Sequence, residues 1–199
     1  MPHVISVVQS KGGTGKTTVT MFLATAMQKK GYKVAVLDSD PQQSAMRWSS
    51  ASEEPLPFPT LPAPSPSELS EGLHRAKKAD FVLIDTPPGN EKIIDAAVSA
   101  ASLVLVPTGV SPMEMDRTQI TLDALAKTTT PVAVVLTNVD RREKLADTVH
   151  AELVGDETMA LADVVIPTRA TTRKAFGTVP DLNEPWKALA TELCSAFED

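Results

Sequence analysis

The sequence predicts one α/β domain over residues 1–199, in which a doubly wound, mainly parallel sheet has helices on both faces. Short runs of β-branched and apolar residues alternate along the chain with segments of helical periodicity. The first run leads directly into a glycine-rich loop and a helix, as in a strand–helix–strand unit. Acidic residues end two of the later runs, which predicts a ligand site at the carboxyl ends of the strands.

The predicted strands contain few polar residues, which is typical of strands that are buried on both faces. The first, 3-HVISVVQ-9, is apolar almost throughout, and the second, 33-KVAVLD-38, stops at a carboxylate. The remaining strands are predicted over 81–85, 103–107, 132–138 and 163–167.

The first predicted helix follows the glycine-rich loop, and Gly31 is placed to end it in a left-handed conformation. Ser111 with Glu114 predicts a capping box for a later helix, and Asp181 with Glu184 predicts a similar start for the last one. The helices after the first are expected near 67–78, 91–101, 112–127, 143–153 and 182–197.

Residues 55–66 contain six prolines, which cannot donate hydrogen bonds to a sheet ladder. The segment is therefore predicted to be an extended surface connection or an edge strand, and not a central strand. Docking of a partner is the alternative role for it.

Composition limits the classes of protein. An apolar content of 42% suits a globular core, and the net charge of −6 argues against a protein that coats nucleic acid with its whole surface. Cys194 is the only cysteine, which excludes an intrachain disulfide and a zinc site of paired cysteines. The chain shows no secretory leader and no apolar run near the ~18 residues of a membrane span. We expect a cytoplasmic protein that does not bind membranes.

The stretch 9-QSKGGTGKTTV-19 matches the phosphate-binding pattern G-x-x-x-x-G-K-[ST], except that Ser10 replaces the first glycine. In such a loop, backbone N–H groups and the amino end of the next helix hold phosphate oxygens. We expect Lys16 to neutralise the β and γ phosphates and Thr17 to ligate Mg²⁺. The predicted phosphate-binding residues are Gly12, Gly13, Thr14, Gly15, Lys16, Thr17 and Thr18.

Asp85 ends an apolar strand and is the expected second anchor for Mg²⁺, as a Walker B acid. The following turn, 86-TPPGN-90, is expected to bring the backbone of Gly89 near the γ phosphate, where its contact would disappear on hydrolysis. ATP with Mg²⁺ is the predicted ligand of this site.

Three stretches together, KGGTGKTT at 11–18, DSDPQ at 38–42 and VLIDTPPG at 82–89, resemble the deviant Walker ATPases of the ParA/MinD family. The resemblance covers nearly the whole chain and implies a P-loop NTPase. It implies that Lys11 reaches across a face-to-face homodimer to the other subunit's nucleotide, so that ATP bridges the two copies. It also implies that Asp40 orients the attacking water and that Asp38 lies near the Mg²⁺ shell. The implied catalytic residues are Lys11, Lys16 and Asp40.

Adenine is the favoured base. A guanine site of the N-K-x-D type needs a lysine and an aspartate where this chain has Val139 and Arg141. The family resemblance implies that Asn138 and the segment after Pro167 contact the adenine.

Composition also separates the branches of this group. Its electron-transferring iron proteins need paired cysteines, its tyrosine kinases carry a tyrosine-rich tail, and its membrane-bound division regulators end in a basic amphipathic helix. This chain has one cysteine, one tyrosine and an acidic segment over 181–199, which anionic lipid would repel. The remaining resemblance is to short ParA-like partition ATPases. It implies non-specific DNA binding by the ATP dimer, a ParB-like centromere-binding partner that triggers hydrolysis, and association with the nucleoid.

One segment suits DNA phosphates. In 168-TRATTRK-174, Arg169, Arg173 and Lys174 occur without an acid, and a dimer would double this patch. A solvated helix start or a segment covering the nucleotide is the equally weighted alternative. Two other functions also stay open: a ParA-like ATPase that positions a protein cargo, and a metabolic ligase similar to dethiobiotin synthetase.

Overall fold

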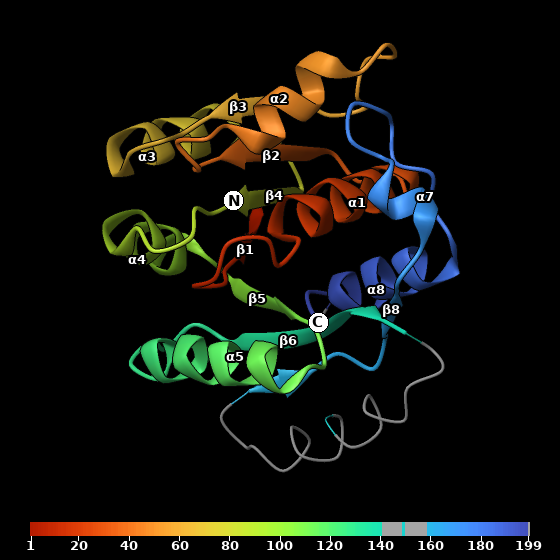
Figure 1. Cartoon of the computed structure of the whole chain (residues 1–199). Helices are drawn as coiled ribbons and strands as arrows, with labels where there is room; N and C mark the ends of the chain where they lie inside the picture. The colour runs from red at the N-terminus through yellow and green to blue at the C-terminus, as the bar shows by residue number, and fades with distance from the viewer. Residues whose placement is uncertain (141–148, 150–158, 199) are drawn as a thin grey trace.

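The computed structural model describes residues 1–140, 149 and 159–198 of the chain. Its centre is a sheet of eight strands in the order β3-β2-β4-β1-β5-β6-β7, with β8 paired to β6 (Figure 1). Every strand pair in these residues is parallel. The strands are β1 (His3–Val7), β2 (Val34–Asp38), β3 (Thr60–Pro62), β4 (Phe81–Asp85), β5 (Leu103–Thr108), β6 (Val132–Val139), β7 (Ala160–Leu161) and β8 (Ile166–Pro167).

Helices cover both faces of the sheet, as the sequence predicts (Figure 1). One face carries α3 (Pro66–Arg75), α4 (Glu91–Ala100) and α5 (Pro112–Leu125), whose apolar residues pack on β1, β2, β4, β5 and β6. The other face carries α1 (Lys16–Lys29), α2 (Ser44–Ala51) and α8 (Glu184–Ser195). The short helix α7 (Ala170–Arg173) follows β8.

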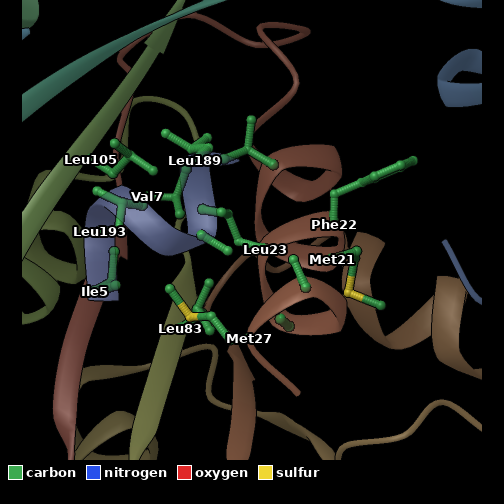
Figure 2. Packing of buried hydrophobic residues seen from close by; sticks show 14 of the residues in the cluster. Ile5, Val7, Met21, Phe22, Leu23, Met27, Leu83, Leu105, Leu189 and Leu193 are labelled. Atoms are coloured by element: carbon green, nitrogen blue, oxygen red, sulfur yellow. The ribbon is translucent and has the colours of Figure 1, made fainter. Parts of the chain in front are cut away.

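The main core lies between the sheet, α1 and α8, as Figure 2 shows. Ile5, Val7, Leu83 and Leu105 point from the strands toward Leu23 and Met27 of α1, and Leu189 and Leu193 come from α8. Each of these side chains is less than 5% exposed. Because α1 packs both on the sheet and on α8, its amino end has a fixed position relative to β1, and the loop between the two elements is anchored at both ends.

Most predicted helix ends agree with the structure. Ser111 and Glu114 form the expected capping box of α5, and Gly31 has φ 99° just after α1. The prediction for the last helix is wrong at its start: α8 begins at Glu184 with Asn183 as N-cap. Asp181 therefore precedes the cap by two residues, and Glu184 occupies the first helical position, so the pair cannot form a capping box.

The proline-rich segment supplies β3, a three-residue strand at the edge of the sheet beside β2. This confirms the edge-strand prediction for residues 55–66. The predicted strand over 163–167 is shorter in the structure, where only β8 forms. The predicted helix over 143–153 lies outside the described residues, apart from Val149. The sequence analysis missed three short elements, namely α2, β7 and α7.

No helix in the described part of the chain combines the length and the apolarity needed to cross a membrane.

Candidate functional site

The candidate site lies where β1, β4 and β2 end side by side. Asp85 at the end of β4 is in register with Val7 of β1 and with Asp38 of β2. Because these strands are parallel, their carboxyl ends meet at one edge, and the glycine-rich loop leaves β1 at the same edge. The topology thus brings together the three motifs that the sequence separates by up to about 80 residues.

The loop ends in two glycines with left-handed backbones, Gly13 at φ 79° and Gly15 at φ 84°, before α1 begins at Lys16. The amine of Lys16 is buried and donates to the carbonyls of Gln9 and Lys11, each at 3.2 Å. Burial lowers the pKa of Lys16, while the carboxylates of Asp85 and Asp40 raise it. The amine therefore crosses the inside of the loop, close to where an anion bound at the helix amino end would lie.

Asp85 is buried, and its Oδ2 accepts a 2.6 Å hydrogen bond from the hydroxyl of Thr17. Its second oxygen, Oδ1, is buried and has no hydrogen-bond partner among the described residues. Burial raises the pKa of Asp85 to about 7. A carboxylate oxygen and a hydroxyl so placed are ligands that suit Mg²⁺. No cluster of three acidic, histidine or cysteine side chains that could hold a metal occurs in the described residues, so a cation here needs further oxygens from phosphate or water.

The two acids of the DSD motif have different surroundings. Both oxygens of Asp38 accept backbone N–H groups, from Asp40 at 3.1 Å and from Met46 at 2.8 Å. Burial raises the pKa of Asp38, and the charge of Asp40 adds to this. Asp38 thereby fixes the turn that leads into α2. Asp40 is half-buried and lines the hollow over the loop.

Two adjoining hollows surround the glycine-rich loop. The larger, of about 430 Å³, is lined by the loop residues Gly12 to Thr18 together with Asp40, Trp48 and Pro88; we call it the phosphate hollow after the contacts predicted for the loop. The smaller, of about 240 Å³, is lined by Asn138 and Pro167 and shares part of the loop; we call it the base hollow after the contacts predicted for these two residues. The structure thus places the predicted phosphate contacts and the predicted adenine contacts around two hollows that share lining residues.

Four predicted residues outside the basic patch line neither hollow, and Asp85, which reaches the site through its hydrogen bond to Thr17, is one of them. Gly89 has φ 68° but lines a different hollow, between α4 and α5, while Pro88 of the same turn faces the loop. Asp38 lines neither hollow, because its oxygens hold the backbone. The side chain of Lys11 also lines neither and has no hydrogen bond or ion pair within the described residues.

The three cationic residues of the basic patch over 168–174 do not all lie at the hollows. Arg169 and Arg173 line the base hollow, and Arg173 also lines the phosphate hollow. Lys174 lines neither, and all three side chains are exposed.

A scan of protein families gives the decisive observation. The model of the CobQ/CobB/MinD/ParA nucleotide binding domain matches residues 5–178. The chain belongs to this family. The resemblance of the sequence to ParA/MinD-type P-loop ATPases is thereby confirmed.

Curated relatives of the family include both partition and positioning proteins. Maintenance of carboxysome distribution protein A of Gloeobacter kilaueensis is 34% identical over 153 residues, which cover 76% of this chain and 69% of that protein. Protein ParA of Rhizobium radiobacter is 34% identical over 120 residues, which cover 59% of this chain and 52% of that protein. The chain thus aligns with only about half of the length of this ParA.

Solved ParA/MinD structures share the fold over essentially the whole chain. A plasmid partition protein of Borrelia burgdorferi B31 bound to AMPPNP has a TM-score of 0.76 at 17% identity, covering 100% of this chain and 99% of that one. MinD of Pyrococcus horikoshii OT3 with Mg-ADP has a TM-score of 0.77 at 21% identity, covering 100% of this chain and 99% of that one. The pNOB8 ParA bound to nonspecific DNA has a TM-score of 0.70 at 18% identity, covering 100% of this chain and 99% of that one.

The sequence analysis missed a buried network that anchors the loop of this ParA/MinD-type ATPase to α5. Gln9 donates to Thr118 at 3.1 Å and accepts from Thr121 at 2.6 Å. The backbone N–H of Ser10 also donates to Gln9, at 2.9 Å. The signal was the pair of threonines three residues apart on a helix, which share one face. Ser10, in place of the usual glycine, is therefore held through its backbone.

Proposed function

We propose that this protein is an ATP-dependent DNA partition ATPase, whose ATP-bound homodimer binds DNA without sequence preference and hydrolyses ATP when a centromere-binding partner stimulates it. One observation carries the proposal. The loop holds one lysine, Lys16, inside the space for a nucleotide, and a second, Lys11, outside it. A second cation that has no partner within the described part of its own subunit is what an ATP-bridged pair requires.

The nucleotide is ATP with Mg²⁺ in this proposal. Backbone N–H groups of Gly12 to Thr18 and the amine of Lys16 bind the phosphates, and Asn138 with Pro167 holds the adenine. Thr17 and the free oxygen of Asp85 hold Mg²⁺, directly or through its water. Bound Mg²⁺ supplies charge neutralisation at the β and γ phosphates. The relatives bound to AMPPNP and to Mg-ADP support this assignment.

Asp40 is the proposed catalytic carboxylate. It lines the phosphate hollow opposite the loop, and its Oδ1 accepts the N–H of Gln42 at 2.8 Å, which holds the side chain in place. In this proposal Asp40 acts by orienting the attacking water. Asp38 lies near the Mg²⁺ shell in this proposal. Its role is to hold the turn that carries Asp40, through hydrogen bonds from the backbone N–H groups of Asp40 and Met46.

Lys11 links ATP to dimerisation. In a face-to-face pair its amine would meet the partner's triphosphate in a seam from which water is excluded, where opposite charges attract more strongly than in solvent. ATP binding and dimerisation then reinforce each other. DNA binding follows in the same proposal, because pairing doubles the patch of Arg169, Arg173 and Lys174 and steepens the salt dependence. The relative pNOB8 ParA bound to nonspecific DNA supports this part.

The experiment measures retention on non-specific double-stranded DNA with ATP, with ADP and without nucleotide. We expect retention with ATP only, decreasing as salt increases. Lys16→Ala should abolish both nucleotide binding and retention. Equal retention with ATP and ADP would contradict the switch. In cells, the corresponding expectation is a cytoplasmic protein that co-localises with the nucleoid.

A second candidate keeps the ATP switch and changes the cargo to a protein assembly. The 34% identity to a carboxysome distribution protein favours it. The metabolic-ligase alternative predicts ATP turnover that a small carboxylate or amine stimulates and DNA does not. Co-purification with a DNA-bound centromere factor, compared with co-purification with a protein cluster, distinguishes the first two candidates.

A further inference from the structure

The short helix α7 lies over the boundary between the two hollows. Thr172 and Arg173 line both of them, as do Gly13 to Gly15 and Thr18 of the glycine-rich loop. A nucleotide with its base at Asn138 and its phosphates on the loop must pass this boundary between its base and its β phosphate. The residues of α7 therefore lie beside the part of the nucleotide between its base and its β phosphate, for which the sequence motifs predict no contact.

Thr172 has an unsatisfied polar group at this boundary. Its hydroxyl oxygen is buried and has no hydrogen-bond partner in the part of the chain that the structure describes. Trp186, which lines the base hollow and is 1% exposed, has an indole N–H in the same condition. Buried polar groups without partners are rare in native proteins, and each one needs an explanation. An unpaired hydroxyl and an unpaired indole N–H beside the base hollow favour a polar ligand at this place.

Arg173 supplies charge at the same place. Its guanidinium has no ion pair within the described residues, and it is exposed rather than packed. A guanidinium can bind a phosphate through two parallel hydrogen bonds. Arg169, the N-cap of α7, also lines the base hollow, whereas Lys174 at the C-cap lines neither hollow.

We propose that Thr172 and Arg173 bind the nucleotide of their own subunit at the phosphates nearest the ribose. The inference rests on the proposed function, because it takes the ligand to be a nucleoside di- or triphosphate. It also divides the basic patch: Arg173 serves the nucleotide, and Lys174 is left for DNA. Since the two residues are neighbours in sequence, nucleotide binding holds α7 in place and with it the cation that faces outward.

Isothermal titration with MgATP, MgADP and adenosine tests the proposal on the full chain. We expect Arg173→Ala to weaken MgATP and MgADP about tenfold or more and to leave adenosine unchanged, because a charged hydrogen bond to phosphate is lost. The matched control is Lys174→Ala, which removes the adjacent cation and should leave all three affinities unchanged while reducing DNA retention. Thr172→Val should weaken MgATP several-fold, and Thr171→Val, at an exposed neighbour, should not.

Arg173→Lys keeps the charge without the two-pronged geometry and should bind with an intermediate affinity, which covers the case in which the alanine variant does not fold. Wild-type affinity of Arg173→Ala for MgATP would overturn the inference alone. An equal loss for adenosine would also overturn it, because the arginine would then contact the nucleoside. A wild-type chain that binds no ATP would instead overturn the proposed function, and this inference with it.

Discussion

Thr17 and Asp85 are joined by a 2.6 Å hydrogen bond that uses one carboxylate oxygen, and the other oxygen is buried with no partner in residues 1–140, 149 and 159–198. The two residues come from the first turn of α1 and the last residue of β4. Such a carboxylate costs stability when it is ionised, because burial removes its hydration and only one oxygen is compensated. A cation bound beside Asp85 would offset this cost.

The first prediction concerns the pH dependence of stability without ligand. Burial raises the pKa of Asp85 from its ordinary value of 3.8 to about 7. Below about pH 4 both the folded and the unfolded state hold the proton, so Asp85 has no effect. Between about 4 and 7 the folded state alone keeps it, so the free energy of unfolding decreases as pH rises. At pH 8 we expect Asp85→Asn to be more stable than wild type, by at most about 4 kcal/mol.

Urea unfolding from pH 4 to pH 8 measures this effect. The two proteins should be equally stable near pH 4 and diverge toward pH 8, and Asp85→Asn should lose the stabilisation that MgATP gives to wild type. A smaller slope of the same sign should remain in the variant, because burial also raises the pKa of Asp38. Parallel pH profiles for the two proteins would refute the assignment of the slope to Asp85.

The second prediction concerns Lys11. Replacing it with alanine should leave MgATP binding by the single subunit within about twofold, since its side chain lines neither hollow. The ATP-dependent dimer should disappear, because the seam loses its cation from each side. Light scattering with a non-hydrolysable ATP analogue measures the dimer. Lys78→Ala, an exposed lysine just before β4 and so at the opposite end of the strands, is the control. A normal dimer of the Lys11 variant would remove the bridging argument.

The third prediction separates binding from hydrolysis at Asp40. Asp40→Ala should bind MgATP as wild type does and reduce hydrolysis by about 100-fold or more, because the attacking water loses its orientation. DNA retention with ATP should then last longer. Phosphate release and filter retention are the measurements, and Asp116→Ala on the exposed side of α5 is the matched control. Hydrolysis that persists in the Asp40 variant would place the water on another group.

The fourth prediction compares two buried threonines. Thr121 donates to Gln9 at 2.6 Å, so Thr121→Val should destabilise the fold by about 1–2 kcal/mol through an unpaired partner and loosen the glycine-rich loop. Thr20 of α1 is also buried, but its hydroxyl has no partner. Thr20→Val should therefore be neutral or stabilising. Thermal unfolding of the two variants gives the comparison, and equal destabilisation would show that both hydroxyls act only through shape.

The local parts of this site could be predicted from sequence. Glycines between a strand and a helix permit few other structures, and Lys16 and Thr17 occupy fixed positions relative to them. Asp85 was predictable because an apolar run that ends in an acid is typical of a buried parallel strand. The role of Asp38 was harder to predict. The sequence places it close to Asp40 but does not show which of the two carboxylates binds the backbone and which faces the ligand. Only the turn into α2 shows that Asp38 holds the backbone.

The position of α7 beside the two hollows could not be predicted. A four-residue helix has no detectable periodicity, and its cationic side chains fit a DNA-binding patch as well as a segment that covers the nucleotide. The choice depends on where β8 pairs with β6, about 30 residues earlier in the chain, which directs the following residues over the glycine-rich loop. The same applies to Gln9, whose partners on α5 lie more than 100 residues away.

The sequence by itself determined the alternation of strands and helices, the phosphate-binding loop and the acid at the end of β4, since these depend on short-range periodicity and on backbone conformations that few residues permit. The tertiary structure decided which side chains share the hollows around that loop. It placed Arg173 inside and Lys11 outside, and it left one oxygen of Asp85 buried without a partner. The physical reason is that contacts between distant segments follow from the packing of whole helices on the sheet, which no local stretch of residues specifies.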